Sequence, residues 1–285
     1  MFRILTSGMS LIDLILNIAC VLLWLKWRDK SHDLLTPKVS LIVTLKKTRP
    51  SHRRVWFLMG LLALLLVRSV LYWQLGSALN WNPPIWFGVI PIPFRGDFFG
   101  RMMLFSFLSF GVALVYFYHC LLLLSILKSD ELKTDPLQNL IREQLGLLDR
   151  LPTFVKLLLP WLAMILFWLA LSKPLVAIGV LPSPKSWQHL IEQGVVTGAS
   201  IYLAWKYLIA GFLLFHLLNS YIYFGPGLAW IFIDRTARQI LKPLSWLPLR
   251  LGRFDFAPLV ATALVLVAAH YAMRGLAWVY LRLPL

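Results

Sequence analysis

The sequence predicts an all-α, polytopic membrane protein: a helix bundle with about six transmembrane helices. Of its 285 residues, 59% are hydrophobic and only 14% are charged, whereas a soluble domain carries about 25% charged residues. The mean hydropathy is +0.74, and the apolar residues form runs close to the ~20 residues that cross a bilayer core. Trp and Tyr cluster near the ends of these runs, where the headgroup boundary favours amphipathic rings. Lipid is therefore the expected solvent for much of the chain.

Six apolar runs are expected to span the membrane. They cover residues 11–27, 55–73, 100–127, 154–171, 202–223 and 256–273. The polar patch 185–193 is expected to belong to the connection before the fifth span, and residues 274–285 to form an interfacial tail.

Two further segments are expected outside the lipid core. In 135–151, apolar residues recur at helical spacing among charges, which predicts an amphipathic helix on the cytoplasmic side. In 226–252, apolar residues mix with arginine and lysine, which is typical of a segment at the membrane interface.

The order of elements indicates two related halves, 1–152 and 153–285. In each half a short Pro- and Arg-containing segment leads to an aspartate before the third helix, Asp97 in one half and Asp255 in the other. Three spans per half would place the second copy upside down relative to the first, as in many transporters. The sequence therefore predicts an internal repeat of inverted topology.

Basic residues predict the orientation. With six alternating spans, eighteen Lys and Arg residues fall in the connections on one side and six on the other. The richer side is expected in the cytoplasm, which puts both termini outside it. The dense basic run 46–54 is explained by this topology and by anionic lipid headgroups, so nucleic acid is not an expected partner.

A basic, proline-containing stretch precedes the sixth span. Its motif residues are Lys242, Pro243, Pro248, Arg250, Gly252, Asp255, Phe256 and Pro258. This pattern resembles the motif of the YggT family of small bacterial and plastid membrane proteins, best over 202–271 and faintly in the first half. In that family the helix begins Asp-Phe-Ser-Pro after paired arginines; here Ala257 replaces the serine, and Ser245 and Trp246 replace the arginines.

The resemblance implies a function without catalysis. YggT-like proteins lie in the bacterial plasma (inner) membrane or in thylakoids, and they are linked to the assembly and organisation of membrane protein complexes. The chain is therefore expected to be a structural subunit or an assembly factor, with other membrane protein subunits and membrane lipids as its partners.

The residues of the motif also have a physical interpretation of their own. Asp255 near a helix N-terminus meets the positive end of the helix dipole and caps free amides, and Pro258 needs no donor in the first turn. The alternative is that Asp255 pairs with Arg250 or Arg253 and fixes a rigid cytoplasmic surface for a partner.

Charged residues interrupt the spans at Arg68, Lys206 and Arg274. An ionisable residue in lipid is a functional hypothesis by default. On the predicted topology these three lie toward the outer ends of their helices, so we expect them to snorkel to the headgroups. The alternative for Arg68 is an ion pair with Asp13 or Asp97.

No catalytic signature is present. The sequence lacks a P-loop, a nucleophile elbow, a His-Glu zinc motif and paired intramembrane carboxylates, so neither an enzyme nor a bound cofactor or metal is expected. Cys20 and Cys120 lie inside apolar runs, which argues against a disulfide framework. The pattern Gly194-x-x-x-Gly198 is expected to serve helix packing.

Two other functions stay open. An inverted-repeat transporter or channel would need polar residues at the midplane, and the sequence offers Asn219 and Ser220. A haem- or quinone-associated subunit of an electron-transfer complex would use histidines in spans, and His119, His216 and His270 lie there. These three do not occupy equivalent places in the two halves, so hydrogen bonding between helices is the simpler expectation.

Overall fold

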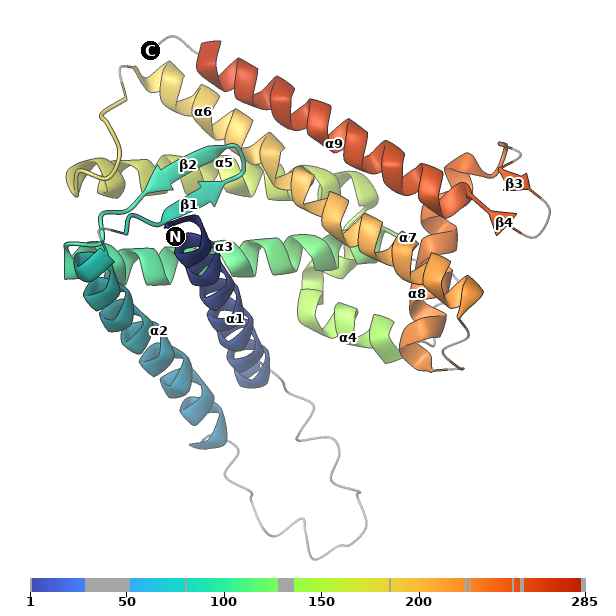
Figure 1. Cartoon of the computed structure of the whole chain (residues 1–285), viewed down its shortest axis with the longest axis horizontal. Coiled ribbons are helices and arrows are strands. Elements are labelled where there is room, and N and C mark those ends of the chain that lie inside the picture. Colours follow the sequence, from blue (N-terminus) through green and yellow to red (C-terminus); the bar gives the residue numbers. More distant parts are fainter. Residues whose placement is uncertain are drawn as a thin grey trace, which may run out of the picture. The chain divides into compact units, whose positions relative to one another are not determined.

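The structure is a computed structural model, and it describes residues 2–28, 52–79, 81–127, 136–184, 186–222, 225, 227–247, 249–251 and 254–282. Helices make up most of this part of the chain (Figure 1). The α-helices are α1 (Phe2–Arg28), α2 (His52–Leu79), α3 (Phe99–Ile126), α4 (Pro136–Leu145), α5 (Thr153–Ala177), α6 (Trp187–Ser200), α7 (Trp205–Tyr221), α8 (Leu228–Leu241) and α9 (Ala257–Arg282). The predicted all-α, polytopic membrane architecture is confirmed.

Five helical segments of the described chain are long and apolar enough to cross a membrane. They are Val55–Gly76, Phe99–Ile126, Thr153–Ala177, Trp187–Tyr221 and Ala257–Arg282. Each contains or closely overlaps one of the predicted spans. The remaining predicted span, 11–27, lies within α1, which carries Asp13, Lys26 and Arg28 among its apolar residues.

The fifth spanning segment begins at Trp187 and not at 202 as predicted. α6, a short 3₁₀ segment at Ile201–Ala204 and α7 follow one another without a break. Residues 187–193 of the polar patch, which was expected in a connection, therefore form the first turns of α6. Ser186 caps this helix, because its Oγ accepts a hydrogen bond from the His189 amide at 3.1 Å.

Two other helix ends also differ from the expectation. α5 continues past 171 to Ala177 and includes Pro174, and the chain then turns at Gly179, whose φ of +71° is a conformation that favours glycine. α9 continues to Arg282, so most of the predicted interfacial tail 274–285 is helical. Apolar runs predict the lipid-facing part of a helix and not the turns that extend beyond it.

A small hairpin connects α2 to α3. Its strands are β1 (Pro84–Phe87) and β2 (Ile90–Pro93), and alternate residues are buried, including Ile85, Phe87, Ile90 and Ile92. Gly88 at the turn has a φ of +63°. The all-α prediction did not include this hairpin. A second, shorter hairpin of β3 (Arg250–Leu251) and β4 (Phe254–Asp255) precedes α9.

The chain divides into two compact units. Unit 1 comprises residues 1–85 and 93–115, and unit 2 comprises residues 86–92 and 116–285. This division does not follow the predicted halves 1–152 and 153–285, because α3 contributes its first part to one unit and its second part to the other. The inverted repeat stays a prediction.

In unit 1, α1 lies beside α2 (Figure 1). The core between them and α3 is formed by Cys20, Leu61, Leu65 and Phe110. Leu61 and Leu65 recur at the spacing of one helical turn, and the buried residues Arg68 and Tyr72 continue the same face of α2. One face of α2 is thus turned inward, and its other residues face lipid.

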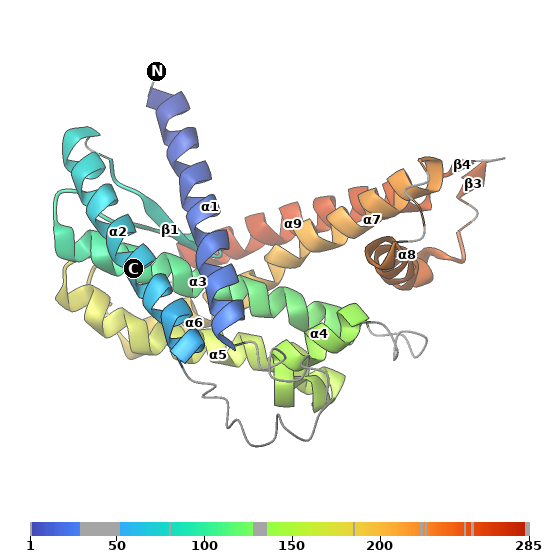
Figure 2. The ribbon, with the colours of Figure 1, turned by 90° about the horizontal axis from the view of Figure 1, so that it is seen from below.

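In unit 2, α7 runs beside α9 in both ribbon views (Figures 1 and 2). Leu213, Ala237 and Ala261 form a core cluster that joins α7, α8 and α9. A second pair, α5 and α6, packs closely as well.

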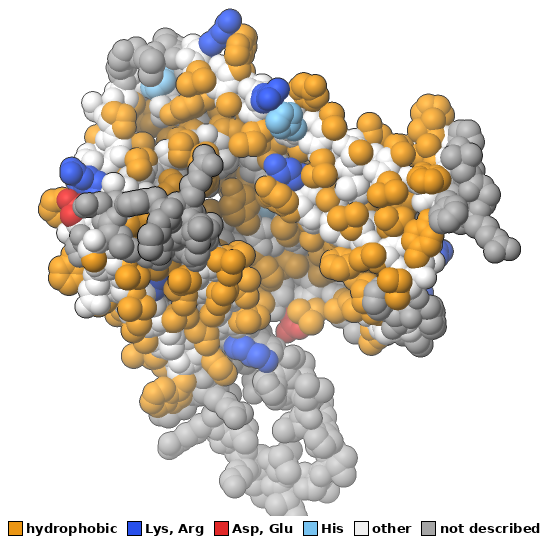
Figure 3. All heavy atoms as spheres, viewed as in Figure 1, with side chains coloured by type: hydrophobic (Ala, Val, Ile, Leu, Met, Phe, Trp, Pro, Cys, Tyr) orange, Lys and Arg blue, Asp and Glu red, His pale blue; other side chains and the backbone are white. Residues whose placement is uncertain are grey.

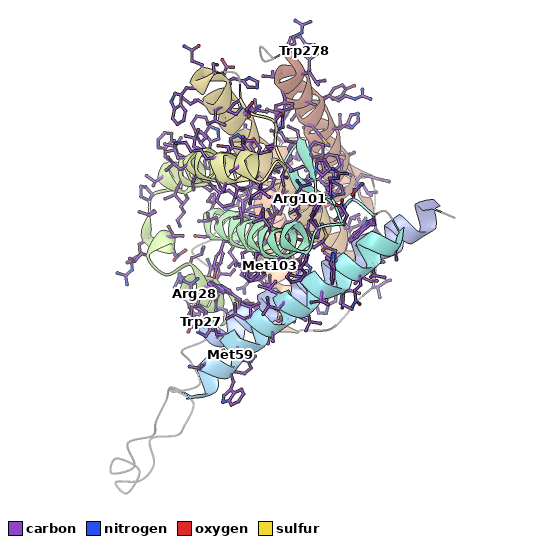
Figure 4. All side chains as sticks on the ribbon, turned by 90° about the vertical axis from the view of Figure 1, so that its left-hand side faces the viewer. Trp27, Arg28, Met59, Arg101, Met103 and Trp278 are labelled. Carbon is purple, nitrogen blue, oxygen red and sulfur yellow. The ribbon has the colours of Figure 1, made fainter. Side chains whose placement is uncertain are left out.

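The surface agrees with a lipid environment. Hydrophobic side chains cover much of the visible face in Figure 3. Trp27 and Arg28 lie at the end of α1 and Trp278 lies toward the end of α9 (Figure 4), the positions of interfacial anchors. The Arg282 guanidinium stacks on the Trp278 ring at 3.8 Å from its centroid.

The Gly194-x-x-x-Gly198 pattern serves helix packing, as predicted. A Cβ atom added at Gly198 would lie 2.9 Å from the backbone oxygen of Trp161 in α5 and 2.8 Å from its indole ring. At Gly194 the added atom would approach Ile165 at 3.4 Å. The absence of a side chain at Gly198 therefore sets the distance between α5 and α6.

We expect Gly198→Ala to destabilise the protein by about 1–3 kcal/mol, because the methyl group overpacks against backbone. The measurement is the free energy of unfolding in detergent, followed by circular dichroism. Gly211→Ala on α7 is the matched control, since nothing lies within 4 Å of its added Cβ. Equal effects of the two substitutions would contradict the packing role.

Candidate functional site

A buried polar cluster lies inside unit 1, centred on Arg68 of α2. The Arg68 side chain is fully buried and forms an ion pair with Asp13 of α1. Its Nη1 donates to Asn17 Oδ1 at 2.8 Å, and its Nη2 donates to Ser109 Oγ at 2.8 Å. Two other helices, α1 and α3, thus provide the partners of a guanidinium on α2.

The partners of Arg68 are also bonded to one another. Asn17 Nδ2 donates to Asp13 Oδ2 at 3.2 Å and to Ser109 Oγ at 3.0 Å. Ser109 Oγ donates to Asp13 Oδ2 at 3.3 Å, and the Tyr72 hydroxyl donates to Asp13 Oδ1 at 3.1 Å. The Asp13 carboxylate therefore has several donors besides the arginine, which offsets its removal from water.

Aromatic rings enclose the guanidinium. Its carbon lies 5.3 Å from the centroid of the Tyr72 ring and 5.9 Å from that of Phe105. These distances allow cation–π attraction, which is strongest where water is excluded. Arg68 and Asp13 balance each other in charge, although 23% of the Asp13 side chain is exposed and Arg68 Nε has no hydrogen-bond partner among the described residues.

The snorkelling interpretation is wrong for Arg68. The residue continues the inward face of α2 formed by Leu61 and Leu65, so its side chain points at α1 and α3 and away from the headgroups. The alternative partner Asp97 is exposed and pairs with Arg95 at 3.9 Å. Asp13 is the partner that the structure shows.

Lys206 and Arg274 have different surroundings from Arg68. Lys206 Nζ lies 4.8 Å from the centroid of the Tyr207 ring, and Arg274 is exposed on α9. Asn219, the other polar residue singled out in a span, is half-buried, and its Oδ1 has no hydrogen-bond partner within the described part of the chain. Snorkelling of Lys206 and Arg274 stays a prediction.

A second buried cluster lies in unit 2, where α3 ends and α5 begins. Lys156 Nζ donates to Ser125 Oγ at 2.7 Å and lies 3.7 Å from Asp149 Oδ1. Ser125 Oγ donates to the same carboxylate oxygen at 2.6 Å, and Arg142 Nε lies 3.6 Å from Asp149 Oδ2. This cluster ties α4 and the 3₁₀ segment Gly146–Arg150 to the ends of the two spanning helices.

The two segments predicted outside the lipid core pack against each other. α4 and the 3₁₀ segment Gly146–Arg150 form the expected amphipathic helix 135–151. α8 lies within the expected interfacial segment 226–252. Ile141 and Leu145 of α4 form a buried cluster with Leu122 of α3 and Phe232 of α8. The connections after the third and fifth predicted spans therefore lie on the same side, as alternating topology requires. We call the surface formed by α4, Gly146–Arg150 and α8 the α4–α8 platform.

The YggT-like motif forms the turn into α9. Asp255 Oδ1 accepts a hydrogen bond from the Ala257 amide at 3.0 Å, which is the predicted capping role. Pro258 is buried in the first turn of α9, whereas Phe256 is exposed. Strand pairing places Arg250 opposite Asp255 in the backbone register.

The other motif positions lie around this turn or outside the description. Lys242 and Pro243 are exposed in a 3₁₀ segment, Lys242–Leu244, that follows α8. Pro248 and Gly252 lie outside the described residues, as does Arg253. The predicted side-chain pairing of Asp255 with Arg250 or Arg253 therefore stays a prediction.

The histidines in the spans have unrelated surroundings. His119 is buried in α3 and stacks on Trp205 at a centroid distance of 4.6 Å, and neither of its ring nitrogens has a hydrogen-bond partner among the described residues. His216 Nδ1 lies 2.6 Å from Asp234 Oδ1, and His270 is exposed on α9. No group of three or more His, Cys, Asp or Glu residues in the described chain is placed to hold a metal ion.

Several members of the two clusters were not identified from the sequence. Asn17, Tyr72 and Ser109 of the first cluster and Ser125, Asp149 and Lys156 of the second were not singled out. Asp13 and Asn17 lie one helical turn apart on an apolar helix, and this spacing is the signal that would have found the α1 side of the first cluster.

Comparisons of the chain with protein-family models, with curated proteins and with solved structures find no match. The resemblance to the YggT family therefore stays a prediction, and the function is inferred from the geometry of this chain.

We expect Arg68→Ala to destabilise the protein by about 3 kcal/mol or more, because it leaves the Asp13 carboxylate without its cation. Asp13→Ala combined with Arg68→Ala should destabilise it less than Arg68→Ala alone. The measurement is a double-mutant cycle on the free energy of unfolding in detergent.

The exposed pair Arg95 and Asp97 gives the control cycle, with an expected coupling of no more than about 1 kcal/mol. An additive cycle for Asp13 and Arg68 would contradict the structural role of their ion pair.

Proposed function

We propose that this protein is a non-enzymatic integral membrane protein that organises or assembles a membrane protein complex, as a structural subunit or as an assembly factor. The observation that carries the proposal is the α4–α8 platform, a rigid surface outside the spans. The charge bias of the sequence supports a cytoplasmic position for this surface. The plasma membrane of a bacterium is the proposed location.

The platform combines firm attachment with exposed apolar side chains. Ile141 and Leu145 hold α4 against the helices beneath it, and the Lys156–Asp149 cluster fixes the segment that follows. Leu140 of α4 is 53% exposed, and Leu147 of the following segment Gly146–Arg150 is 79% exposed. Large apolar side chains at the aqueous end of a membrane protein favour contact with a partner, since exposure to water is unfavourable for them.

The polar residues in the spans support a structural role over transport. A transporter needs polar groups that line a path for its substrate, often at broken helices. In unit 1, Arg68 and Asp13 bind each other, and the Arg68 side chain has no exposed surface. The cost of burying such groups is met by packing three helices together.

The test is crosslinking in native membranes with the full-length, tagged protein, followed by mass spectrometry. We expect a reproducible set of membrane proteins crosslinked to α4 or to Gly146–Arg150. Leu147→Glu should reduce these crosslinks at least several-fold, because it places a charge in the apolar contact, while the protein stays in the membrane.

Asn139→Glu is the matched control, since it adds the same charge at an exposed polar position of α4. Crosslinks that survive Leu147→Glu would overturn the proposed contact surface. Substrate or ion flux through the purified protein alone in liposomes would favour the transporter alternative.

A further inference from the structure

A groove of about 840 Å³ lies in unit 2 where α7 ends and α9 begins. The polar residues that line it are His216, Ser220, Arg238, Lys242, Ser245 and Asp255. Leu140 and Leu147, the exposed apolar residues proposed to contact a partner, do not line this groove. The groove is close to equally polar and apolar, so it suits a ligand with both kinds of surface.

Two cations face the groove from successive turns. Arg238 lies on α8, and its Nη2 donates to Asp234 Oδ2 at 2.7 Å, which holds the guanidinium in place and leaves 71% of the side chain exposed. Lys242 follows one turn later, is exposed, and has no ion-pair partner in the described part of the chain. An arginine and a lysine one turn apart are a common arrangement for binding an anion.

His216 provides a third, oriented group. Its Nδ1 lies 2.6 Å from Asp234 Oδ1, so the carboxylate fixes the ring. The opposite nitrogen, Nε2, has no hydrogen-bond partner among the described residues and is left for a ligand in the groove. Asp234 thus positions both His216 and Arg238.

Hydroxyl groups complete the polar lining. Ser220 lies one turn after His216 on α7 and is exposed. Ser245 Oγ donates to the Lys242 carbonyl oxygen at 2.8 Å and keeps its lone pairs for another donor. Hydroxyl, imidazole, guanidinium and ammonium groups together are the usual partners of a phosphate.

Two carboxylates lie beside the two cations of the groove. Asp234 pairs with Arg238 and His216, and Asp255 Oδ1 accepts from the amide at the start of α9. The groove therefore offers an anion the donor groups of Arg238, Lys242 and His216, and not an excess of positive charge.

The groove lies at the ends of two candidate spans, where lipid headgroups are expected. It opens where the spanning segment Trp187–Tyr221 ends and the spanning segment Ala257–Arg282 begins. Tyr221 and Trp246 nearby are 52% and 78% exposed, as expected for aromatic residues at the membrane boundary.

We propose that this groove binds a phosphate group, either that of an anionic phospholipid headgroup or that of a soluble phosphate compound. Arg238, Lys242 and His216 bind the phosphate oxygens, and the hydroxyls of Ser220 and Ser245 complete the site. This proposal depends on the membrane architecture and does not depend on the proposed role in organising a complex.

The test is equilibrium binding to the purified full-length protein in detergent, with three probes: dihexanoylphosphatidylglycerol, inorganic phosphate, and dihexanoylglycerol, which lacks phosphate. We expect Lys242→Ala to weaken binding of the phosphate-bearing probe about tenfold, the usual effect of losing a charge-assisted hydrogen bond. The thermal unfolding midpoint should not change, since Lys242 is exposed.

Arg235→Ala is the matched control, because Arg235 is exposed on α8 and does not line the groove. Tighter binding of the phospholipid than of inorganic phosphate supports a lipid headgroup, and equal affinity with mutual competition supports a soluble phosphate. Equal binding of dihexanoylglycerol, no measurable binding of either phosphate probe, or equal effects of Arg235→Ala and Lys242→Ala would overturn the proposal.

Discussion

The buried charge of Arg68 is the constraint on which the packing of unit 1 depends. A guanidinium removed from water and lipid headgroups needs an anion and several hydrogen-bond acceptors within reach. Asp13 and Asn17 of α1 and Ser109 of α3 meet this need. Because each partner comes from a fixed position on its helix, the register and rotation of α1, α2 and the first part of α3 are set together.

Unit 2 follows the same rule, but its charged clusters lie at the ends of spans. Lys156, Ser125 and Asp149 join the connection after α3 to α5, and His216, Asp234 and Arg238 join α7 to α8. These contacts hold α4 and α8 as ordered elements outside the spans. The internal charges of this protein are used to hold its helices together. Surfaces outside the spans are then available for recognition, and the proposed partner contact and the proposed phosphate site both lie on such surfaces.

Composition and apolar runs predicted the membrane architecture and the approximate spans because lipid imposes a simple rule on length and hydropathy. Helix ends were less predictable: the polar residues 187–193 begin a helix, since Ser186 caps it and His189 bonds to Gln193. The capping by Asp255 followed from local chemistry. Predicting the Arg68 cluster would have required knowledge of which face of α2 turns inward. Tyr72 and Ser109 gave no signal in the sequence, because hydroxyl groups are common in spans.

The central claim is that the polar cluster around the fully buried Arg68 is a structural element of unit 1 and not part of an aqueous path. Cys20 is fully buried one turn from Asn17, and Cys120→Ala leaves it as the single cysteine of the chain. The most direct measurement is the reaction of Cys20 with a membrane-impermeant thiol reagent in native membranes, with Asp97→Cys as the exposed control. The account predicts that Cys20 reacts only after denaturation; labelling at the rate of the control in the folded protein would contradict it.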